Sequence, residues 1–247
     1  MNIDEIKSEI KSRGYWEVVL CPAKYPENLF SFDELKKIVK ESQIRQRGWY
    51  YPHISESNEF GDYYNANNYI ESWIRWGYRA EIFRFYTSGQ FVHYFGMPED
   101  RQDDSPSPYT RWNSDMKKAQ PKPHYIEPIT SFYSLIEIFL FASNLANKKI
   151  FGSNLHILIK LHNQNDRILQ SNDPNRWWGG HTYKSHTDTI NLVDTVLNAD
   201  DLLLKHDELA IEYTVKLLTF FNDNPEGLDK ILETDLEKFY KIGIMRN

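Results

Sequence analysis

The chain has 247 residues, and its 35 acidic against 29 basic side chains give a net charge of −6 and a pI of about 5.8. This balance argues against broad, nonspecific nucleic-acid binding but leaves room for a local basic groove. The single cysteine, Cys21, excludes an internal disulfide and a cysteine-rich zinc site. The N-terminus is charged and no apolar run reads as a membrane span, so we expect a cytoplasmic protein that makes no membrane contact.

Helix and strand signals alternate over the first part of the chain. Asn2 can cap a helix, Pro22 should end a strand, and Ser31 with Glu34 fits a capping box. Pro52 cannot donate to a central ladder, so the strand that contains it should lead into a loop. The predicted elements are a helix over 2–14, a strand over 15–21, a helix over 31–43, a strand leading into a loop over 47–54, and a loop over 55–68.

An aromatic-rich stretch, residues 69–96, organises the chain and predicts a three-stranded antiparallel meander. Ser88 and Gly89 can form a two-residue turn, because Gly tolerates positive φ. That turn places Tyr86 opposite Phe91. One face of the meander is then mostly apolar and should lie on the core. Its residues are Ser72, Ile74, Trp76, Phe83, Phe85, Val92 and Tyr94.

The second face of the meander mixes aromatic rings with charged groups. It carries Tyr69, Glu71, Trp73, Arg75, Ile82, Arg84, Tyr86, Phe91, His93 and Phe95. So many rings are unusual on a solvated face, and we expect something to cover them. In one interpretation a helix makes this face a second core layer, and Arg84 forms an internal ion pair with Glu71. In the other it is a platform that stacks on a base or partner and meets an anion. The candidate binding residues are then Trp73, Arg75, Arg84, Tyr86 and His93.

The second part of the chain begins with a proline-rich segment. Residues 98–128 hold six of the eleven prolines and predict a long surface excursion, with Tyr109, Arg111 and Trp112 as candidate contact residues. Residues 129–148 are apolar almost all round and predict a buried core helix. The remaining predicted elements are a strand over 155–161, its hairpin partner over 167–170, a loop over 177–180, one or two strands over 183–197, and helices over 198–221 and 228–240.

The order of these elements predicts an α+β fold, in which an antiparallel meander packs against long apolar helices. We expect a single domain over residues 1–247. Two lobes, 1–97 and 125–247, joined by the excursion over 98–128, are the alternative organisation.

The motifs of common enzyme classes are absent from the sequence. It contains no Walker loop, dinucleotide fingerprint, G-x-S-x-G elbow or H-E-x-x-H helix, so we expect no cofactor and no metal and assign no catalytic residue. The leading hypothesis is a non-enzymatic binding or accessory protein whose partner is a nucleotide, a single-stranded nucleic acid or a protein subunit, including a second copy. The alternative is a metal-dependent hydrolase or nuclease. Its site would be drawn from His53, His93, His181, His186 and Asp188, which would have to converge in one cleft.

Several short motifs suggest a family. Arg47-Gly48-Trp49, Tyr51-Pro52-His53-Ile54 and Phe83-Arg84-Phe85-Tyr86, followed by Ser88-Gly89-Gln90-Phe91-Val92-His93-Tyr94, together resemble the signature of an uncharacterised family of prokaryotic proteins. The resemblance covers most of the chain. It implies a prokaryotic cell and a defence or mobile-element setting, with antiviral defence as the expected context, and it transfers no catalytic residues.

Overall fold

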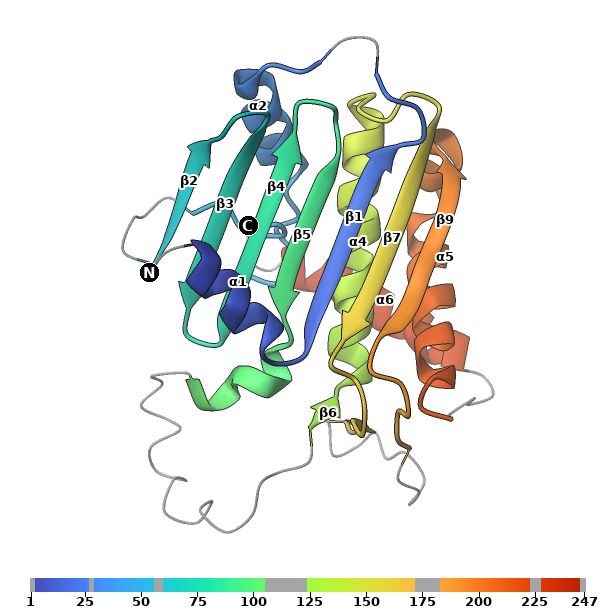
Figure 1. Ribbon diagram of the computed structural model, residues 1–247. Coiled ribbons are helices and arrows are strands. Elements are labelled where there is room, and N and C mark those ends of the chain that lie inside the picture. Colours follow the sequence, from blue (N-terminus) through green and yellow to red (C-terminus); the bar gives the residue numbers. More distant parts are fainter. Residues whose placement is uncertain are drawn as a thin grey trace.

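A seven-stranded antiparallel sheet forms the centre of the protein. The computed structural model describes residues 3–26, 29–55, 60–104, 124–171, 183–222 and 228–244. The strands of the sheet are β1 (Tyr15–Pro22), β2 (Gly61–Asn65), β3 (Tyr69–Trp76), β4 (Arg79–Tyr86), β5 (Phe91–Gly96), β7 (Asn154–His162) and β9 (Ile190–Asn198). They lie in the order β2-β3-β4-β5-β1-β7-β9 (Figure 1). The α+β fold with an antiparallel meander is therefore confirmed.

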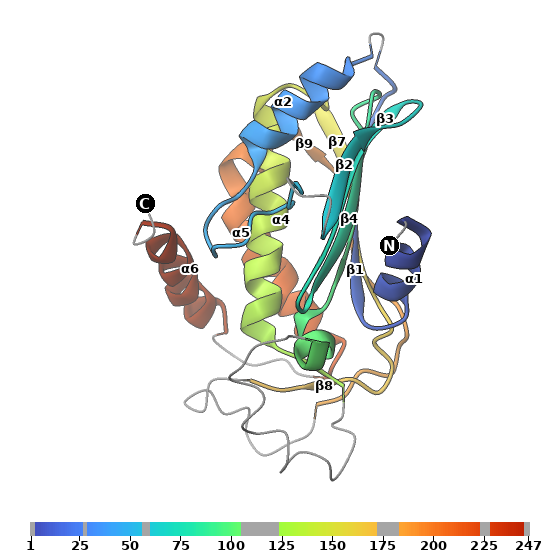
Figure 2. The same cartoon turned by 90° about the vertical axis from the view of Figure 1, so that its left-hand side faces the viewer.

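The helices are divided unequally between the two faces of the sheet. They are α1 (Ile3–Lys11), α2 (Phe32–Ser42), α4 (Pro128–Asn147), α5 (Ala199–Thr219) and α6 (Leu228–Ile244). The last four lie on one side of the sheet, whereas α1 lies alone on the other (Figure 2). A short 3₁₀ helix, η1 (Pro98–Asp104), follows β5 at one end of the sheet.

The local signals for the helix starts are confirmed. Ser31 accepts from the Glu34 N–H while the Glu34 carboxylate accepts from the Ser31 N–H, which is the capping box that begins α2. Asn198 caps α5 by accepting from the N–H groups of Asp200 and Asp201. The predicted cap at Asn2 lies outside the described residues, as do Tyr109, Arg111, Trp112 and the loop over 177–180.

Helix α4 is the centre of the main hydrophobic core. It packs on the apolar face of the sheet and buries Phe132, Phe139 and Phe141 completely. Its length and composition alone would suit a membrane span, but 72% of its most apolar 18-residue stretch is buried inside the protein. This burial agrees with the predicted core helix.

Strand β1 joins the two parts of the sheet. It pairs with β5 on one side and with β7 on the other, both antiparallel. Strands from residues 1–97 and from residues 125–247 therefore share one continuous hydrogen-bonded sheet. The region that separates them, residues 105–123, is not described.

The register of the β4–β5 hairpin differs from the prediction by one residue. Phe85, rather than Tyr86, lies opposite Phe91. The reason is a three-residue turn, in which Gly89 has a φ of +82° and its N–H donates to the Tyr86 carbonyl. A slip of one residue exchanges the two faces of a strand. In β5 this slip places Phe91, His93 and Phe95 on the face that α4 covers. Val92 and Tyr94 then lie on the face that α1 covers.

Three further predictions of secondary structure are wrong. Residues 47–54 form no strand and only a single bridge, between Ile44 and Tyr51. Part of the predicted loop over 55–68 is the edge strand β2, paired with β3. The predicted hairpin partner over 167–170 contains β8 (Ile168–Leu169), which pairs in parallel with β6 (Tyr125–Ile126) instead of with β7. In the last case the partner strand lies far away in the sequence, so the local sequence does not indicate it.

Candidate functional site

Four of the five predicted binding residues lie on the face that α1 covers. Arg84 donates to Glu71 in an ion pair whose carboxylate side chain is only 1% exposed, and the Tyr64 hydroxyl donates to the same carboxylate. Arg75 is paired with Glu9 of α1. The internal ion pair beneath a helix, predicted as the structural alternative, is therefore present.

The remaining groups on this face also have partners within the protein. Trp73 is buried in a small cluster with Ile6 and Ile10 of α1. Tyr86 is half-buried, and its ring centre lies 5.1 Å from that of Tyr69. Beside α1 a hollow of about 230 Å³ remains, lined by Lys7, Lys11, Ile82, Arg84, Tyr86, Val92 and Tyr94.

His93, the fifth predicted residue, lies on the opposite face. Its side chain is fully buried beneath α4, as the register of β5 requires, so its predicted place beside Arg84 is wrong. Its Nε2 lies 3.0 Å from Glu81 Oε2. Because a carboxylate only accepts, Nε2 donates to Glu81. The buried Nδ1 of the same ring has no hydrogen-bond partner within the described part of the chain.

His93 lines a cavity of about 410 Å³ between the sheet, α4 and the segment after α2. Segments far apart in the sequence supply its polar walls. The residues are Arg47, Trp49 and Tyr51 from the segment after α2, Tyr78, Arg79, Glu81, His93 and Phe95 from β4, β5 and the preceding turn, Glu99 from η1, and Thr130, Ser134 and Glu137 from α4. A cavity of this size and mixed polarity is typical of sites for small ligands.

Glu81 is the hub of hydrogen bonds in this cavity. Besides His93, the Trp49 indole donates to its Oε1 at 2.6 Å and the His53 backbone N–H donates to its Oε2 at 3.2 Å. Burial opposes ionisation of this carboxyl, but the bonds from His93 and Trp49 outweigh it and hold the pKa of Glu81 below its usual value. Glu81 is therefore a buried, charged anchor for the ring of Trp49.

A second ion pair forms the wall on the side of α4. Arg47 donates from Nε and Nη2 to the two oxygens of Glu137, which is buried inside the apolar helix. The Tyr51 ring lies nearby, between His93 and Phe141. Burial, together with the charges of Glu137 and Glu81, raises the pKa of Tyr51 well above its usual value. The buried Tyr51 hydroxyl has no hydrogen-bond partner among the described residues.

Arg79 is the cation of the cavity that lacks a carboxylate. Among the described residues it forms no ion pair, and its guanidinium lies 5.1 Å from the ring centres of both Trp49 and Tyr78. Stacking on aromatic faces holds a guanidinium in place without neutralising it. The cavity thus combines two aromatic rings with a cation available to an anionic group.

Glu99 supplies a carboxyl group that titrates near neutrality. Its Oε1 accepts from the Glu127 N–H at 3.2 Å, at the residue that caps α4. Burial raises the pKa of Glu99 to about 7, against the lowering effect of backbone hydrogen bonds from Glu99 and Glu127. A carboxyl group with this pKa can act either as a donor or as an acceptor at neutral pH.

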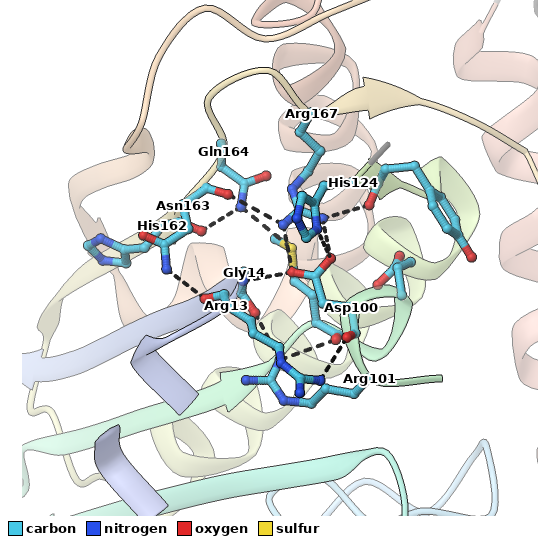
Figure 3. A network of polar contacts seen from close by, with 12 residues as sticks. Arg13, Gly14, Asp100, Arg101, His124, His162, Asn163, Gln164 and Arg167 are labelled. Carbon is cyan, nitrogen blue, oxygen red and sulfur yellow. Dashed lines mark hydrogen bonds and ion pairs between the residues drawn. The ribbon is translucent and has the colours of Figure 1, made fainter. Parts of the chain in front are cut away.

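A buried network fixes η1, and with it Glu99 (Figure 3). Arg167 donates to both oxygens of Asp100, at 2.8 and 2.7 Å, and the Gly14 N–H donates to the same carboxylate at 2.7 Å. A Cβ at Gly14 would lie 2.3 Å from the guanidinium of Arg167, so only glycine fits there. Arg101 donates to the carbonyls of Glu9 and Ile10 near the end of α1 and to that of Gly14 just beyond it. The network ties together the chain start, η1 and the segment after β7.

The alternative set of catalytic histidines does not meet in one cleft. His53 and His93 both approach Glu81, but His186 and Asp188 lie on the exposed segment before β9 and do not line the cavity. His181 lies outside the described residues. In the described ranges no group of three His, Cys, Asp or Glu residues is placed to hold a metal ion.

Sequence reasoning missed most of the residues that line the cavity. Arg47, Trp49 and Tyr51 belong to a segment that is expected to form a strand, and Glu137 is a charged residue within the apolar helix over 129–148. That charge was the usable signal, because a buried carboxylate requires a partner. Nothing in the local sequence of Arg79 or Glu99 indicates that they share a cavity with it.

Comparisons with known proteins give no match. No family model matches the chain, and no curated protein or solved structure has significant similarity to it. The resemblance to an uncharacterised prokaryotic family therefore stays a prediction.

Proposed function

We propose that this protein is a binding protein whose cavity holds a nucleotide. The proposal rests chiefly on one observation about the described part of the chain: two residues that line the cavity, Tyr51 and His93, each have a buried polar atom without a partner, Oη and Nδ1, and a third, Arg79, is a cation without a carboxylate. Buried polar groups are rarely left unsatisfied, so they favour a ligand that supplies the missing bonds.

The chemistry of the walls favours a nucleotide over a simple anion. Glu81 and Glu137 are carboxylates of the inner wall, and they would repel a phosphate placed deep in the cavity. A nucleobase instead offers both donors and acceptors to His93 Nδ1, Tyr51 Oη and Glu99. Its phosphate would remain with Arg79, between the rings of Trp49 and Tyr78.

Isothermal titration calorimetry with the four nucleoside monophosphates, their triphosphates and inorganic phosphate tests the proposal. We expect at least one nucleotide to bind and inorganic phosphate to bind much more weakly. Arg79→Gln should weaken binding by roughly tenfold or more, since hydrogen bonds to charged groups contribute about 1.5–3 kcal/mol. Lys205→Gln, an exposed change on α5, is the matched control. Absence of binding by every nucleotide, or equal affinity of Arg79→Gln and the wild type, would contradict the proposal.

Hydrolysis of the bound nucleotide is the second candidate function. It is favoured by Glu99, whose pKa of about 7 suits a general acid or base, in the same cavity as the His93–Glu81 pair. Product analysis after incubation of each nucleotide with and without Mg²⁺ is the test. Turnover that Glu99→Gln abolishes, with binding retained, would establish catalysis. If the nucleotides remain intact after prolonged incubation, the protein binds them without hydrolysing them.

The cellular context of this proposal comes from the sequence alone. We propose a cytoplasmic accessory protein of a prokaryotic defence system, as the resembling family implies. A partner subunit is compatible with nucleotide binding, because the two functions require different surfaces. Native mass spectrometry of the protein purified from its own host distinguishes a nucleotide adduct from a larger complex.

A further inference from the structure

A second hollow lies next to the cavity, between α2 and the outer strands β2 and β3. This groove measures about 710 Å³ and is more apolar than the cavity. Its lining residues are Lys36, Lys40, Gln43, Arg45, Tyr50, His53, Ile54, Ser55, Phe60, Tyr63, Ile74 and Trp76. Nothing in the proposed nucleotide site requires it, so the groove needs its own explanation.

The groove is locally basic on an acidic protein. Lys36, Lys40 and Arg45 line it, whereas no Asp or Glu does. None of these three cations forms an ion pair with any residue in the described ranges. Lys36 and Lys40 are one turn apart on α2, about 6 Å along the helix axis, so they lie along one wall. With a net charge of −6 for the whole chain, this concentration of positive charge favours an anionic partner.

The same groove exposes large aromatic rings. Trp76 is 56% exposed, Phe60 43% and Tyr50 41%. Large apolar side chains gathered in one hollow are typical of a binding surface. Two of the cations already lie over rings of the groove, Lys36 over Tyr63 at 5.6 Å and Arg45 over Tyr50 at 4.9 Å. The groove therefore places positive charges next to aromatic rings.

A run of stacked rings connects the groove to the cavity. The Trp49 ring, on the cavity wall, lies 5.7 Å from Trp76 with an interplanar angle of 29°. It also lies 4.1 Å from the His53 ring, at an angle of 16°. This stack ends at the exposed Trp76, and an exposed ring with cations in the same groove suits an unpaired base and its phosphate.

We infer that this groove binds a single-stranded nucleic acid, with bases stacked on Trp76, Tyr50 and Phe60 and phosphates held by Lys36, Lys40 and Arg45. Base stacking on exposed rings is independent of sequence and requires unpaired bases, so a duplex does not fit. The inference does not depend on nucleotide binding in the cavity, because the two hollows use different cations.

Fluorescence anisotropy with labelled oligothymidylate and oligouridylate of roughly ten nucleotides tests the inference. We expect affinity to fall steeply between about 50 and 200 mM salt. The triple variant Lys36→Gln, Lys40→Gln, Arg45→Gln should flatten the salt slope by about two, since each phosphate contact contributes about 0.7 for single strands. Trp76→Ala should weaken binding by about tenfold, and its exposure means that the fold should tolerate the change.

Matched controls separate this inference from its alternatives. Lys205→Gln and Leu204→Ala remove an exposed cation and an exposed apolar side chain on α5, and they should leave the affinity unchanged. Tyr51→Phe should affect mononucleotide binding only, and Lys40→Gln oligonucleotide binding only. The inference is overturned if neither oligonucleotide binds at low salt, or if a duplex binds equally well. It is also overturned if polyglutamate of matched charge competes equally, because the surface would then suit an acidic protein.

Discussion

The two faces of the sheet carry the same kinds of residue but differ in whether the polar groups of these residues have partners. On the face beneath α1, the charged groups are paired: Arg84 with Glu71, and Arg75 with Glu9. On the face beneath α4, Glu81 is fully bonded, yet its neighbours Tyr51 and His93 keep buried polar atoms without partners among the described residues. Charge and aromatic content alone therefore do not identify a site. The difference lies in which polar atoms the protein leaves unsatisfied.

The two faces also differ in how completely the space above them is filled. Helix α1 fills the space above its face with Ile6 and Ile10, leaving a hollow of about 230 Å³. Helix α4 is larger, but the carboxylates of Glu81 and Glu137 and the guanidinium of Arg47 keep its end of the core polar around a cavity of about 410 Å³. A protein that needed this region only for stability would be expected to fill it with apolar side chains.

The largest effect is expected in the buried network that fixes η1. Asp100→Ala would leave the Arg167 guanidinium, 1% exposed, without its carboxylate, which should lower the free energy of unfolding by about 3–5 kcal/mol. Urea denaturation provides the measurement. Glu237→Ala removes the exposed pair with Lys241 within α6 and should change the free energy of unfolding by less than about 1 kcal/mol. Equal effects of the two changes would refute the structural role of the network.

A smaller effect is expected beneath α1. Arg84→Met would leave the buried Glu71 carboxylate with only the Tyr64 hydroxyl, lowering the free energy of unfolding by about 3 kcal/mol. The double variant with Glu71→Gln should recover most of this loss. Nucleotide affinity should change by less than about twofold in either variant. Loss of nucleotide affinity without loss of stability would mean that the face beneath α1 is the binding site, as the platform interpretation predicts. The cavity beneath α4 would then not be the binding site.

Tyr51→Phe should have the opposite sign. Removal of a buried hydroxyl without a partner is expected to raise the free energy of unfolding of the free protein by about 1 kcal/mol. The same change should weaken nucleotide binding, because the ligand loses a hydrogen-bond donor. Urea denaturation without ligand and calorimetry with ligand measure the two effects. A destabilised variant would mean that the hydroxyl has a structural role.

The last prediction concerns pH. The pKa of Glu99 is about 7 in the folded protein against 4.5 for a free side chain, so between these values the folded state binds more protons than the unfolded state. Rising pH therefore lowers stability through this window, and the loss is complete above pH 7. The Gln side chain of the Glu99→Gln variant cannot ionise. The Tm of the variant minus that of the wild type should therefore increase from about pH 5 to about pH 8. Glu233→Gln, an exposed change on α6, should show no such trend.

The elements of this fold could be predicted where the deciding signals are local. The capping box of Ser31 and Glu34, the cap at Asn198 and the apolar content of α4 each act within a few residues. The faces of β3 and β4 also followed from alternation. The face of β5 did not, because a Thr-Ser-Gly sequence fits a two- or a three-residue turn, and the choice between them decides where His93 points.

The site could not be predicted because its parts come from distant segments. Arg47 and Glu137 meet only when α4 packs on the sheet, and Glu99 reaches the cavity only because Asp100 is anchored by Arg167. The covering helix α1 had a usable signal, since Ile6 and Ile10 are spaced for one helical face and required a surface to cover.

The position of β1 in the sheet has a consequence for synthesis on the ribosome. This strand is made first, yet its two edges are covered by β5 and β7, and β7 ends only at His162. Until that residue leaves the exit tunnel, a nascent chain that has formed the β1–β5 pair presents an open edge of apolar strand. Such edges recruit other chains. The protein should therefore depend on chaperones during translation more than its finished, closed core would indicate.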